Sequence, residues 1–326
     1  MPTYSLVVPA YNEEAVVSEL VVRLGQLMDA LDADAEAILV DDGSRDRTYE
    51  LMVEATAGDP RFRLVGLSRN FGHQIALTAG VDLAAGEAVV VMDADLQHPP
   101  EVVLELAKRW REGYDVVYGV RDERTGETRF KRYTADLFYR GFNRISEVPV
   151  PVDVGDFRLV DRRVLNVFLQ MRESNRFVRG MFSWIGLEQI GVSYQGSERF
   201  AGESKYPLQR MLRFAVAGVI SFSSAPLRAA LKLGFAVSIL TFAFGVWSIV
   251  VKLSGLYEVP GWTSIVVVVT LIGGVQLIVL GVIGEYIASI HDEVKRRPLY
   301  VIGDLENFPD APPLPPRAVV VRPRGR

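Results

Sequence analysis

Short apolar runs alternate along the first 120 residues with stretches whose apolar residues recur at helical spacing. Ala88–Met92 is the clearest run, since it contains no polar residue, and it is typical of a strand buried on both faces. Further strands are expected at Tyr4–Val8, Ala37–Val40, Arg63–Leu67 and Asp115–Gly119. Regular alternation of this kind predicts an α/β fold with a doubly wound, mostly parallel sheet.

Four of the expected strands end in polar, acidic or turn-forming residues. These ends are Pro9–Glu13, Asp41–Ser44, Ser68–Gly72 and Asp93–Gln97. Open α/β sheets bind their ligands at the carboxyl ends of the strands, so we expect the four ends to line one site. The sequence contains no glycine-rich phosphate-binding motif. A nucleotide would therefore be held by carboxylates and a metal ion.

Asp93, Asp95 and Gln97 follow the Ala88–Met92 run at alternate positions. In an extended chain such positions point the same way, which would present three oxygen donors together. Two adjacent carboxylates favour a cation between them, and hard oxygen ligands suit Mg²⁺ or Mn²⁺. The alternative is a solvated turn after a strand; the neighbouring polar strand ends favour the metal site.

Three further segments carry candidate chemistry. The cations between Arg121 and Arg144 form either a solvated helix face or a clamp for an anionic ligand. Asp156 follows a glycine and precedes an aromatic residue, where a turn or cap is the simplest role. Residues 199–206 form a polar, glycine-bearing loop of the kind that can close over a ligand. His73 is expected to be structural, and His98 to start a helix, with a ligand or phosphate contact as its alternative.

The pattern changes beyond residue 206. Residues 207–228 predict an amphipathic helix with cations on its polar face, suited to a membrane interface. Leu233–Val251 and Val259–Gly284 contain no charge, and each approaches the roughly 20 apolar residues that cross a bilayer. Basic residues flank the pair at Arg228, Lys232 and Lys295–Arg297. The positive-inside rule therefore predicts that both termini are cytoplasmic.

These patterns predict four consecutive parts. They are a cytosolic domain at 1–206, an interface helix at 207–228, a two-helix transmembrane hairpin at 229–290 and a cytosolic segment at 291–326. The tail from Pro309 is rich in Pro and Arg and is expected to be disordered.

The amino-acid composition limits the classes of function that are possible for this chain. Hydrophobic residues make up 49% of the chain, which agrees with a membrane-embedded part. A net charge of −4 argues against a general nucleic-acid binder. The absence of cysteine excludes disulfides and zinc–thiolate sites. The amino terminus lacks the pattern of a signal peptide, so we expect the first domain to begin in the cytosol.

Eight short motifs of the sequence, taken together, resemble those of a known protein family. In order, they are VVPAYNEE, VDDGS, SRNFGHQIALTAG, DADLQHPPE, GDFRL and GESKY, followed by GVIGEYI and RPLY. This set resembles the family 2 inverting glycosyltransferases of GT-A fold, and within them the polyprenyl-phosphate glycosyltransferases. The bactoprenol (undecaprenyl-phosphate) glucosyltransferase type, related to dolichol-phosphate mannose synthases, is the most similar. The resemblance covers residues 4 to 301 approximately, and the tail departs from it.

The resemblance implies a role for each matching residue. The nucleoside pocket would comprise Pro9, Tyr11, Glu13 and Asp42, with Asp42 on the base. The donor-contacting acid would be Asp93, and the metal ligands Asp93, Asp95 and Gln97. The proposed base would be Asp156. The acceptor phosphate would meet Arg121, Lys131 and Arg132, and the donor phosphates would meet Arg199, Ser204 and Lys205.

The implied reaction is inverting transfer of a sugar to the phosphate of a membrane polyprenyl carrier, for cell-envelope glycosylation. UDP-glucose is the favoured donor; GDP-mannose, UDP-N-acetylglucosamine and a UDP-modified arabinose stay open. The implied location is the inner (plasma) membrane, and a homo-oligomer packed through the spans is compatible with the sequence. A catalytically inactive scaffold of the same fold is the alternative from another class. A processive synthase or a transporter would need more spans.

Overall fold

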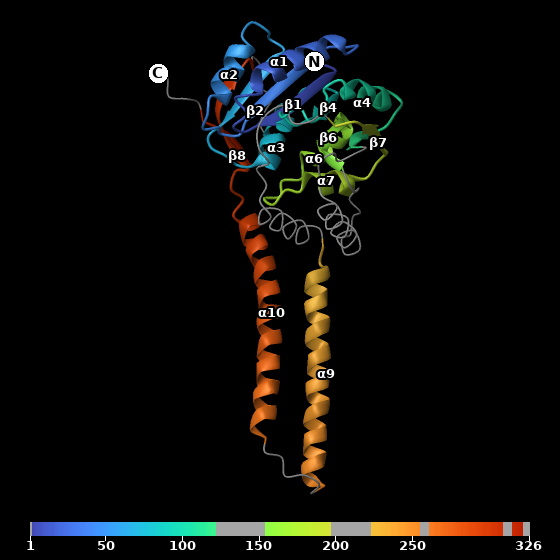
Figure 1. Cartoon of the computed structure of the whole chain (residues 1–326), viewed down its shortest axis with the longest axis vertical. Helices are drawn as coiled ribbons and strands as arrows, with labels where there is room; N and C mark the ends of the chain where they lie inside the picture. Colours follow the sequence, from blue (N-terminus) through green and yellow to red (C-terminus); the bar gives the residue numbers. More distant parts are fainter. Residues whose placement is uncertain (1, 122–153, 197–222, 255–260, 309–314, 322–326) are drawn as a thin grey trace.

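The computed structural model describes residues 2–121, 154–196, 223–254, 261–308 and 315–321. Within them, one nine-stranded sheet forms a domain from which two long helices project (Figure 1). The strands are β1 (Tyr4–Ala10), β2 (Ala35–Asp41), β3 (Phe62–Leu67), β4 (Ala88–Val91), β5 (Val116–Arg121), β6 (Val154–Asp161), β7 (Gln189–Tyr194), β8 (Tyr300–Glu306) and β9 (Ala318–Val320). The helices are α1 (Val17–Ala30), α2 (Thr48–Ala55), α3 (His73–Leu83), α4 (Val102–Arg111), α6 (Arg162–Phe168), α7 (Val178–Ile185), α9 (Ala225–Leu253) and α10 (Trp262–Val294).

The sheet is mostly parallel at its centre, as the alternating pattern predicts. Its strand order is β7-β5-β6-β4-β1-β2-β3-β8-β9. Strands β4, β1, β2 and β3 are parallel neighbours. Strand β6 runs antiparallel between β4 and β5, and β8 runs antiparallel beside β3. The expected α/β fold class is confirmed.

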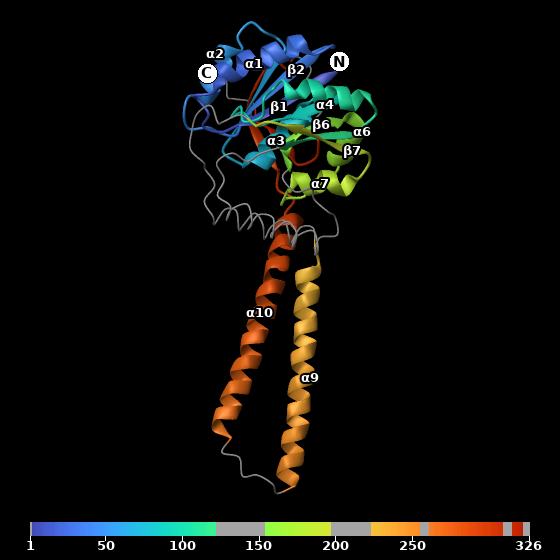
Figure 2. The same ribbon diagram turned by 45° about the vertical axis from the view of Figure 1, so that its right-hand side comes forward.

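Helices cover both faces of the sheet, and each face has its own apolar core. Leu6 and Val8 of β1 pack into the cluster that α1, α2 and α4 complete, whereas Val7 packs into the cluster under α3, α6 and α7. Figure 2 shows α1 and α2 on one side of the strands and α3 and α7 on the other. Strand β4 is fully buried, as expected for a central strand between two helical layers.

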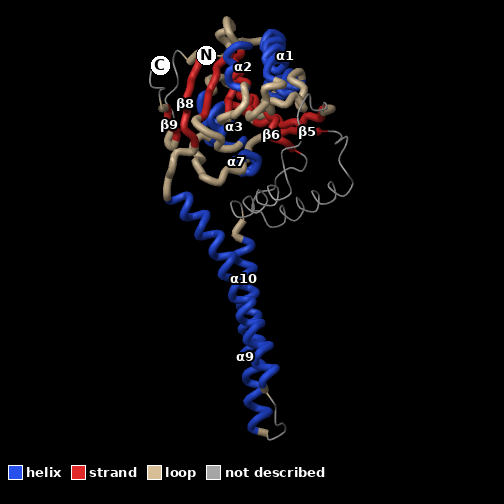
Figure 3. Tube along the Cα trace, turned by 60° about the vertical axis from the view of Figure 1, so that its left-hand side comes forward, coloured by secondary structure: helices blue, strands red, loops and turns tan. Residues whose placement is uncertain are grey.

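Helices α9 and α10 run side by side away from the sheet, as Figures 1 and 3 both show. Two stretches, Ala225–Val251 and Val267–Val294, are long and apolar enough to cross a membrane, and none of their most apolar window is buried. Phe242, for example, is 74% exposed. Exposed apolar helices of this length fit a lipid environment better than a protein core. The predicted interface helix at 207–228 lies mostly outside the described residues.

The chain returns to the sheet after α10, which differs from the predicted organisation. Strand β8 pairs with β3, and β9 pairs with β8. Tyr300 and Ile302 of β8 are completely buried. A disordered tail was expected from Pro309, yet Ala318–Val320 forms a strand. This segment covers the otherwise open edge of β3, so the sheet extends beyond residues 1–206.

Candidate active site

The polar strand ends gather at one edge of the sheet. Because β1, β2, β3 and β4 are parallel, the segments that follow them lie at the same edge. Strand β6 enters this edge from the opposite direction. Its register pairs Val91 at the end of β4 with Arg158, and Asp156 lies two residues before Arg158 on the same strand. Asp156 thus belongs to a central strand, not to the turn or cap that its neighbours suggested.

The segment after β4 presents alternate residues to the site. Asp93, Asp95 and Gln97 are partly exposed, while Ala94 and Leu96 between them are buried. The backbone turns here, and Leu96 adopts a positive φ of 57°. The Asp95 carboxylate accepts a hydrogen bond from the Gln97 amide at 3.1 Å. Polar and apolar residues thus alternate in exposure here, but the chain is turned and not extended, and a shared orientation of the three oxygen-bearing side chains stays a prediction.

His73 lies between the two acids at the start of α3. Its Nε2 is 3.4 Å from Asp93 Oδ1 and 3.5 Å from Asp156 Oδ2. Burial opposes a charge on the imidazole, but the hydrogen bond to Asp156 and the charges of Asp93 and Asp156 outweigh it and raise the pKa of His73 to about 9. A cationic His73 therefore balances the two carboxylates, which is a more direct part in the site than the structural one expected from sequence.

Asp156 is held from three sides. Besides His73, it accepts hydrogen bonds from Gln74 Nε2 at 2.8 Å and from Arg179 Nε at 3.0 Å. Its carboxyl group is buried, which alone would raise the pKa, but the positive charge of Arg179 and the contacts with His73 bring the pKa of Asp156 well below its usual range. A carboxylate held ionised in this way is a weak base.

His98 supports Asp93 from the other side. Its Nε2 is 3.2 Å from Asp93 Oδ2, and its Nδ1 is 2.6 Å from the hydroxyl of Tyr194. Burial raises the pKa of Tyr194 to about 12, so its hydroxyl stays protonated, while the Asp93 carboxylate can only accept a hydrogen bond. His98 Nε2–H then points to Asp93. The ring stacks on Phe157 at 4.9 Å between centroids, which fixes its orientation.

The loops after β1, β2 and β3 are bound to one another. Both oxygens of Asp42 accept backbone N–H bonds, from Phe71 at 2.7 Å and Gly72 at 2.9 Å. Asp42 is 2% exposed, and burial raises its pKa to about 6. Gly43 approaches the backbone of Arg69 so closely that a Cβ there would lie 2.4 Å from it. Asp42 thus anchors the β3–α3 loop, and its contact with a nucleobase stays a prediction.

The other predicted nucleoside residues lie beside Asp42. Pro9 is buried in β1, and Tyr11 and Glu13 follow, partly exposed. The backbone N–H of Glu13 donates to Thr48 Oγ1 at 2.9 Å, which joins the β1 loop to the start of α2. These residues are therefore brought together at the site edge, as expected.

The predicted phosphate-binding residues are only partly described. Arg121 ends β5 opposite Tyr194, which places it at the same sheet edge as Asp93. Gly196 lies against its guanidinium group, where a Cβ would come within 2.2 Å of Nε. The remaining predicted residues lie outside the described residues: Lys131, Arg132, Arg199, Ser204 and Lys205.

The donor set fits a hard divalent cation. Asp93 and Asp95 supply carboxylates and Gln97 an amide oxygen, which are ligands that Mg²⁺ and Mn²⁺ accept. No group of three or more His, Asp or Glu arranged to hold a metal occurs among the described residues. A cation here would therefore rely on the amide and on groups of a bound ligand.

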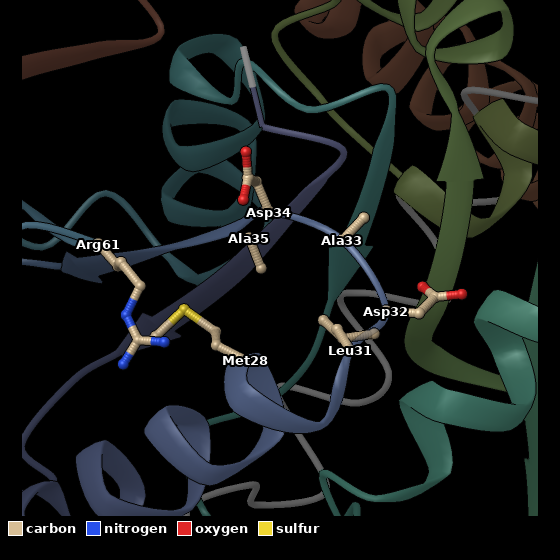
Figure 4. Close-up of a pocket in the computed structure, with 7 residues that line it drawn as sticks. All are labelled: Met28, Leu31, Asp32, Ala33, Asp34, Ala35 and Arg61. Carbon is tan, nitrogen blue, oxygen red and sulfur yellow. The ribbon is translucent and has the colours of Figure 1, made fainter.

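A shallow pocket elsewhere contains no predicted site residue. It is lined by Met28, Leu31, Asp32, Ala33, Asp34, Ala35 and Arg61 (Figure 4). These residues surround the start of β2, at the opposite end of the strand from Asp42, so this pocket is separate from the site.

Gln74 and Arg179, which donate hydrogen bonds to Asp156, were not predicted from the sequence. Gln74 follows His73 directly within the SRNFGHQ motif, which was a usable signal. Arg179 lies on α7, and nothing in its neighbourhood distinguishes it from a surface cation. The contact depends on the packing of α7 against β6, which spacing along the chain does not encode.

Comparison with known proteins gives close relatives. A family model described as Glycosyl transferase family 2 matches residues 5–169. The uncharacterized glycosyltransferase YkcC of Bacillus subtilis (strain 168) is 48% identical, covering 92% of this chain and 93% of that protein. The bactoprenol glucosyl transferase of Shigella phage SfII is 39% identical, covering 91% and 96%.

Solved structures are more distant. The glucosyl-3-phosphoglycerate synthase from Mycobacterium tuberculosis, crystallised with Mn²⁺, UDP-glucose and phosphoglyceric acid, is 20% identical with a TM-score of 0.45. The match covers 68% of this chain and 79% of that one. Similarity at this level carries no argument about ligands.

Proposed function

The chain belongs to glycosyltransferase family 2, and on this premise we propose that it transfers glucose from a nucleotide sugar to the phosphate of a polyprenyl lipid. Bactoprenol glucosyl transferases related to it over nearly its whole length support this proposal. The observation that carries it is the union, in one chain, of an acid-rich sheet edge with two exposed apolar helices. UDP-glucose is the donor we favour, and undecaprenyl phosphate the acceptor.

The proposed reaction is a direct displacement at the anomeric carbon. A phosphate oxygen of the lipid forms a bond to this carbon while the bond to the nucleoside diphosphate breaks, with inversion. The second pKa of a phosphate monoester is about 6, so the attacking oxygen is largely ionised at neutral pH. No base is needed to activate it, which agrees with the lowered pKa of Asp156.

Asp156 then acts by organising cations. It holds Arg179 and His73 beside the place where two anionic substrates must meet. Arg121, at the end of β5, would face the acceptor phosphate, since a guanidinium group can bind phosphate through two parallel hydrogen bonds. Lys131 and Arg132 are proposed to extend this clamp.

Asp93, Asp95 and Gln97 would hold Mg²⁺ or Mn²⁺. When bound, the ion would stabilise the negative charge of the departing diphosphate. His98 and His73 position the Asp93 carboxylate. Asp42 and the loops that it anchors would shape the nucleoside pocket with Pro9, Tyr11 and Glu13, and Arg199, Ser204 and Lys205 would close on the donor phosphates.

The two apolar helices give the site its location. We propose that they span the plasma membrane with the sheet and both termini in the cytoplasm, in agreement with the flanking basic residues. A site held at the headgroup layer meets its lipid substrate by diffusion in a plane, which favours encounter in the correct orientation. A homo-oligomer that packs through the spans is compatible with this arrangement.

Arg121→Ala tests the assignment of the acceptor side. We expect the KM for polyprenyl phosphate to rise about tenfold or more, because a charge-assisted phosphate contact is lost, while the KM for the nucleotide sugar changes little. Arg163→Ala is the matched control, since Arg163 is exposed and pairs with Asp115 away from the site. A larger rise in the KM for the nucleotide sugar than in the KM for polyprenyl phosphate would instead assign Arg121 to donor binding.

A further inference from the structure

Three residues from distant parts of the chain meet where α10 reaches the catalytic domain. We call Ser174, Glu293 and Arg317 the junction. The Ser174 backbone N–H donates to Glu293 Oε2 at 2.7 Å, and Arg317 Nη1 donates to Glu293 Oε1 at 2.8 Å. Arg317 Nη2 also donates to Ser174 Oγ at 2.7 Å. Each member of the junction thus contacts both others, and the cytosolic end of α10 is fixed to the domain at this point.

A buried ion pair anchors the same region to the sheet. Arg172, two residues before Ser174, forms a two-pronged pair with Asp82 at the end of α3, at 2.8 and 3.0 Å. The Tyr300 hydroxyl of β8 donates to the same carboxylate at 2.6 Å. Asp82 and Tyr300 are almost completely buried. These contacts tie the segment before the junction to helix α3 and to strand β8.

The segment that begins at the junction ends at the active site. Val178, four residues after Ser174, donates its backbone N–H to Gln74 Oε1 at 3.1 Å. The next residue, Arg179, contacts Asp156. Helix α3 makes a second connection, since it begins at His73 and carries Asp82 in its last turn. Two short connections thus run from the region of the junction to the site.

Helix α10 extends beyond its apolar stretch before it reaches the junction. The uncharged residues end at Gly284, and Glu285 is the first charge. From there to Val294 the helix continues for about 15 Å, at roughly 1.5 Å per residue. A continuous helix transmits its position in the bilayer to its end, so the junction determines how far the catalytic edge stands from the lipid headgroups.

We propose that Ser174, Glu293 and Arg317 are positioning residues that hold the catalytic edge at the height where a membrane-embedded lipid phosphate reaches it. The proposal rests on the proposed function, because it assumes a phosphorylated lipid acceptor. The junction touches no substrate. It acts by fixing the end of α10 to the domain that carries the site, and it matters only for an acceptor that is itself fixed in the bilayer.

The experiment compares two acceptors with the full-length protein in phospholipid vesicles. One is long-chain undecaprenyl phosphate in the same vesicles, and the other is a short, water-soluble isoprenyl phosphate. For Glu293→Ala and Arg317→Gln we expect kcat/KM for the long acceptor to fall about tenfold or more, since small misplacements are costly. For the short acceptor we expect a change below about twofold.

Asp292→Ala is the matched control, because the only side-chain contact described for Asp292 is with Lys295 on the same helix, and it should leave both values unchanged. Glu293→Gln keeps one oxygen that can accept a hydrogen bond. Its kcat/KM for the long acceptor should therefore lie between the values of the wild type and of Glu293→Ala. Equal losses with both acceptors, or no loss with either, would overturn the junction proposal. A wild-type protein that glycosylates neither acceptor would instead overturn the proposed function.

Discussion

Asp156 illustrates how neighbours decide what a carboxylate can do. Asp156 and Asp93 both lie within 3.5 Å of His73 Nε2, and His73, Gln74 and Arg179 offset the cost of the negative charge on Asp156. The same contacts that keep Asp156 ionised remove its tendency to accept a proton. The residue is thus better suited to holding cations in place than to general base catalysis.

Asp156→Asn separates these two roles. We expect kcat to fall by about 100-fold, because Arg179 and His73 lose their anionic partner. The acidic limb of the pH–rate profile, which the acceptor phosphate sets near pH 6, should stay in place. The measurement is kcat from about pH 5 to about pH 8 with saturating substrates. If the acidic limb of the pH–rate profile were absent in the variant, Asp156 would be identified as the base that titrates.

Asp42 makes a pH-dependent contribution to stability. Its pKa of about 6 in the folded protein exceeds the value of 3.8 for an ordinary Asp. The folded state therefore binds this proton more tightly, and its contribution to stability is present at low pH and is lost as the pH rises toward 6. Above that pH, burial of the charge is a cost that the anchoring of the β3–α3 loop must offset.

Asp42→Asn removes this titration. Relative to the wild type, the variant should gain stability as the pH rises from about 4 to about 7, by on the order of 2 kcal/mol. Denaturant unfolding of both proteins in the same detergent measures the difference at each pH. A stability difference that is constant or that shrinks with rising pH would contradict the raised pKa.

Single residues were predicted well where a strand end and a motif coincide. Asp93, Asp95 and Gln97 are partly exposed while Ala94 and Leu96 are buried, because the alternation of polar and apolar residues is a local property of the chain. Arg179 could not be predicted. Its contact with Asp156 depends on how α7 packs against β6, and the spacing of residues along the chain does not determine this packing. His73 was expected to be structural for the same reason.

At the scale of elements, the largest difference from expectation is β8. Strand β8 follows the two long apolar helices in sequence, and a charged, proline-rich continuation gave no sign of a sheet partner. Its fully buried Tyr300 is held by Asp82 on α3, so a long-range hydrogen bond stabilises an edge that local propensity does not specify.

Tyr300→Phe tests how much this contact contributes. We expect the free energy of unfolding to fall by about 1–3 kcal/mol, because a buried hydrogen bond to a charged group is lost while Asp82 keeps Arg172. Tyr49→Phe is the control, since the buried Tyr49 hydroxyl has no hydrogen-bond partner within the described part of the chain. Equal destabilisation by both substitutions would show that the Asp82 contact adds nothing.

At the scale of the whole molecule, the sheet and the apolar helices were predictable because both depend on long, repetitive patterns. The alternation of strands and helices predicts the parallel centre, and charge-free runs predict α9 and α10. The way in which the two parts join was not predictable. It depends on Ser174, Glu293 and Arg317, which meet only after the chain has left the sheet, formed the helices and returned.

We propose that an acid-rich sheet edge and an apolar hairpin together transfer a sugar to a lipid phosphate, with a divalent ion at Asp93, Asp95 and Gln97. The most direct measurement is transfer of radiolabelled sugar from UDP-glucose to undecaprenyl phosphate in vesicles by the full-length wild type and by Asp95→Asn. We predict a glycolipid product from the wild type that requires added Mg²⁺ or Mn²⁺, and a loss of at least about 100-fold in a folded Asp95→Asn protein. Metal-dependent transfer that survives this substitution, or no transfer by the wild type from any of the candidate donors, would contradict the account.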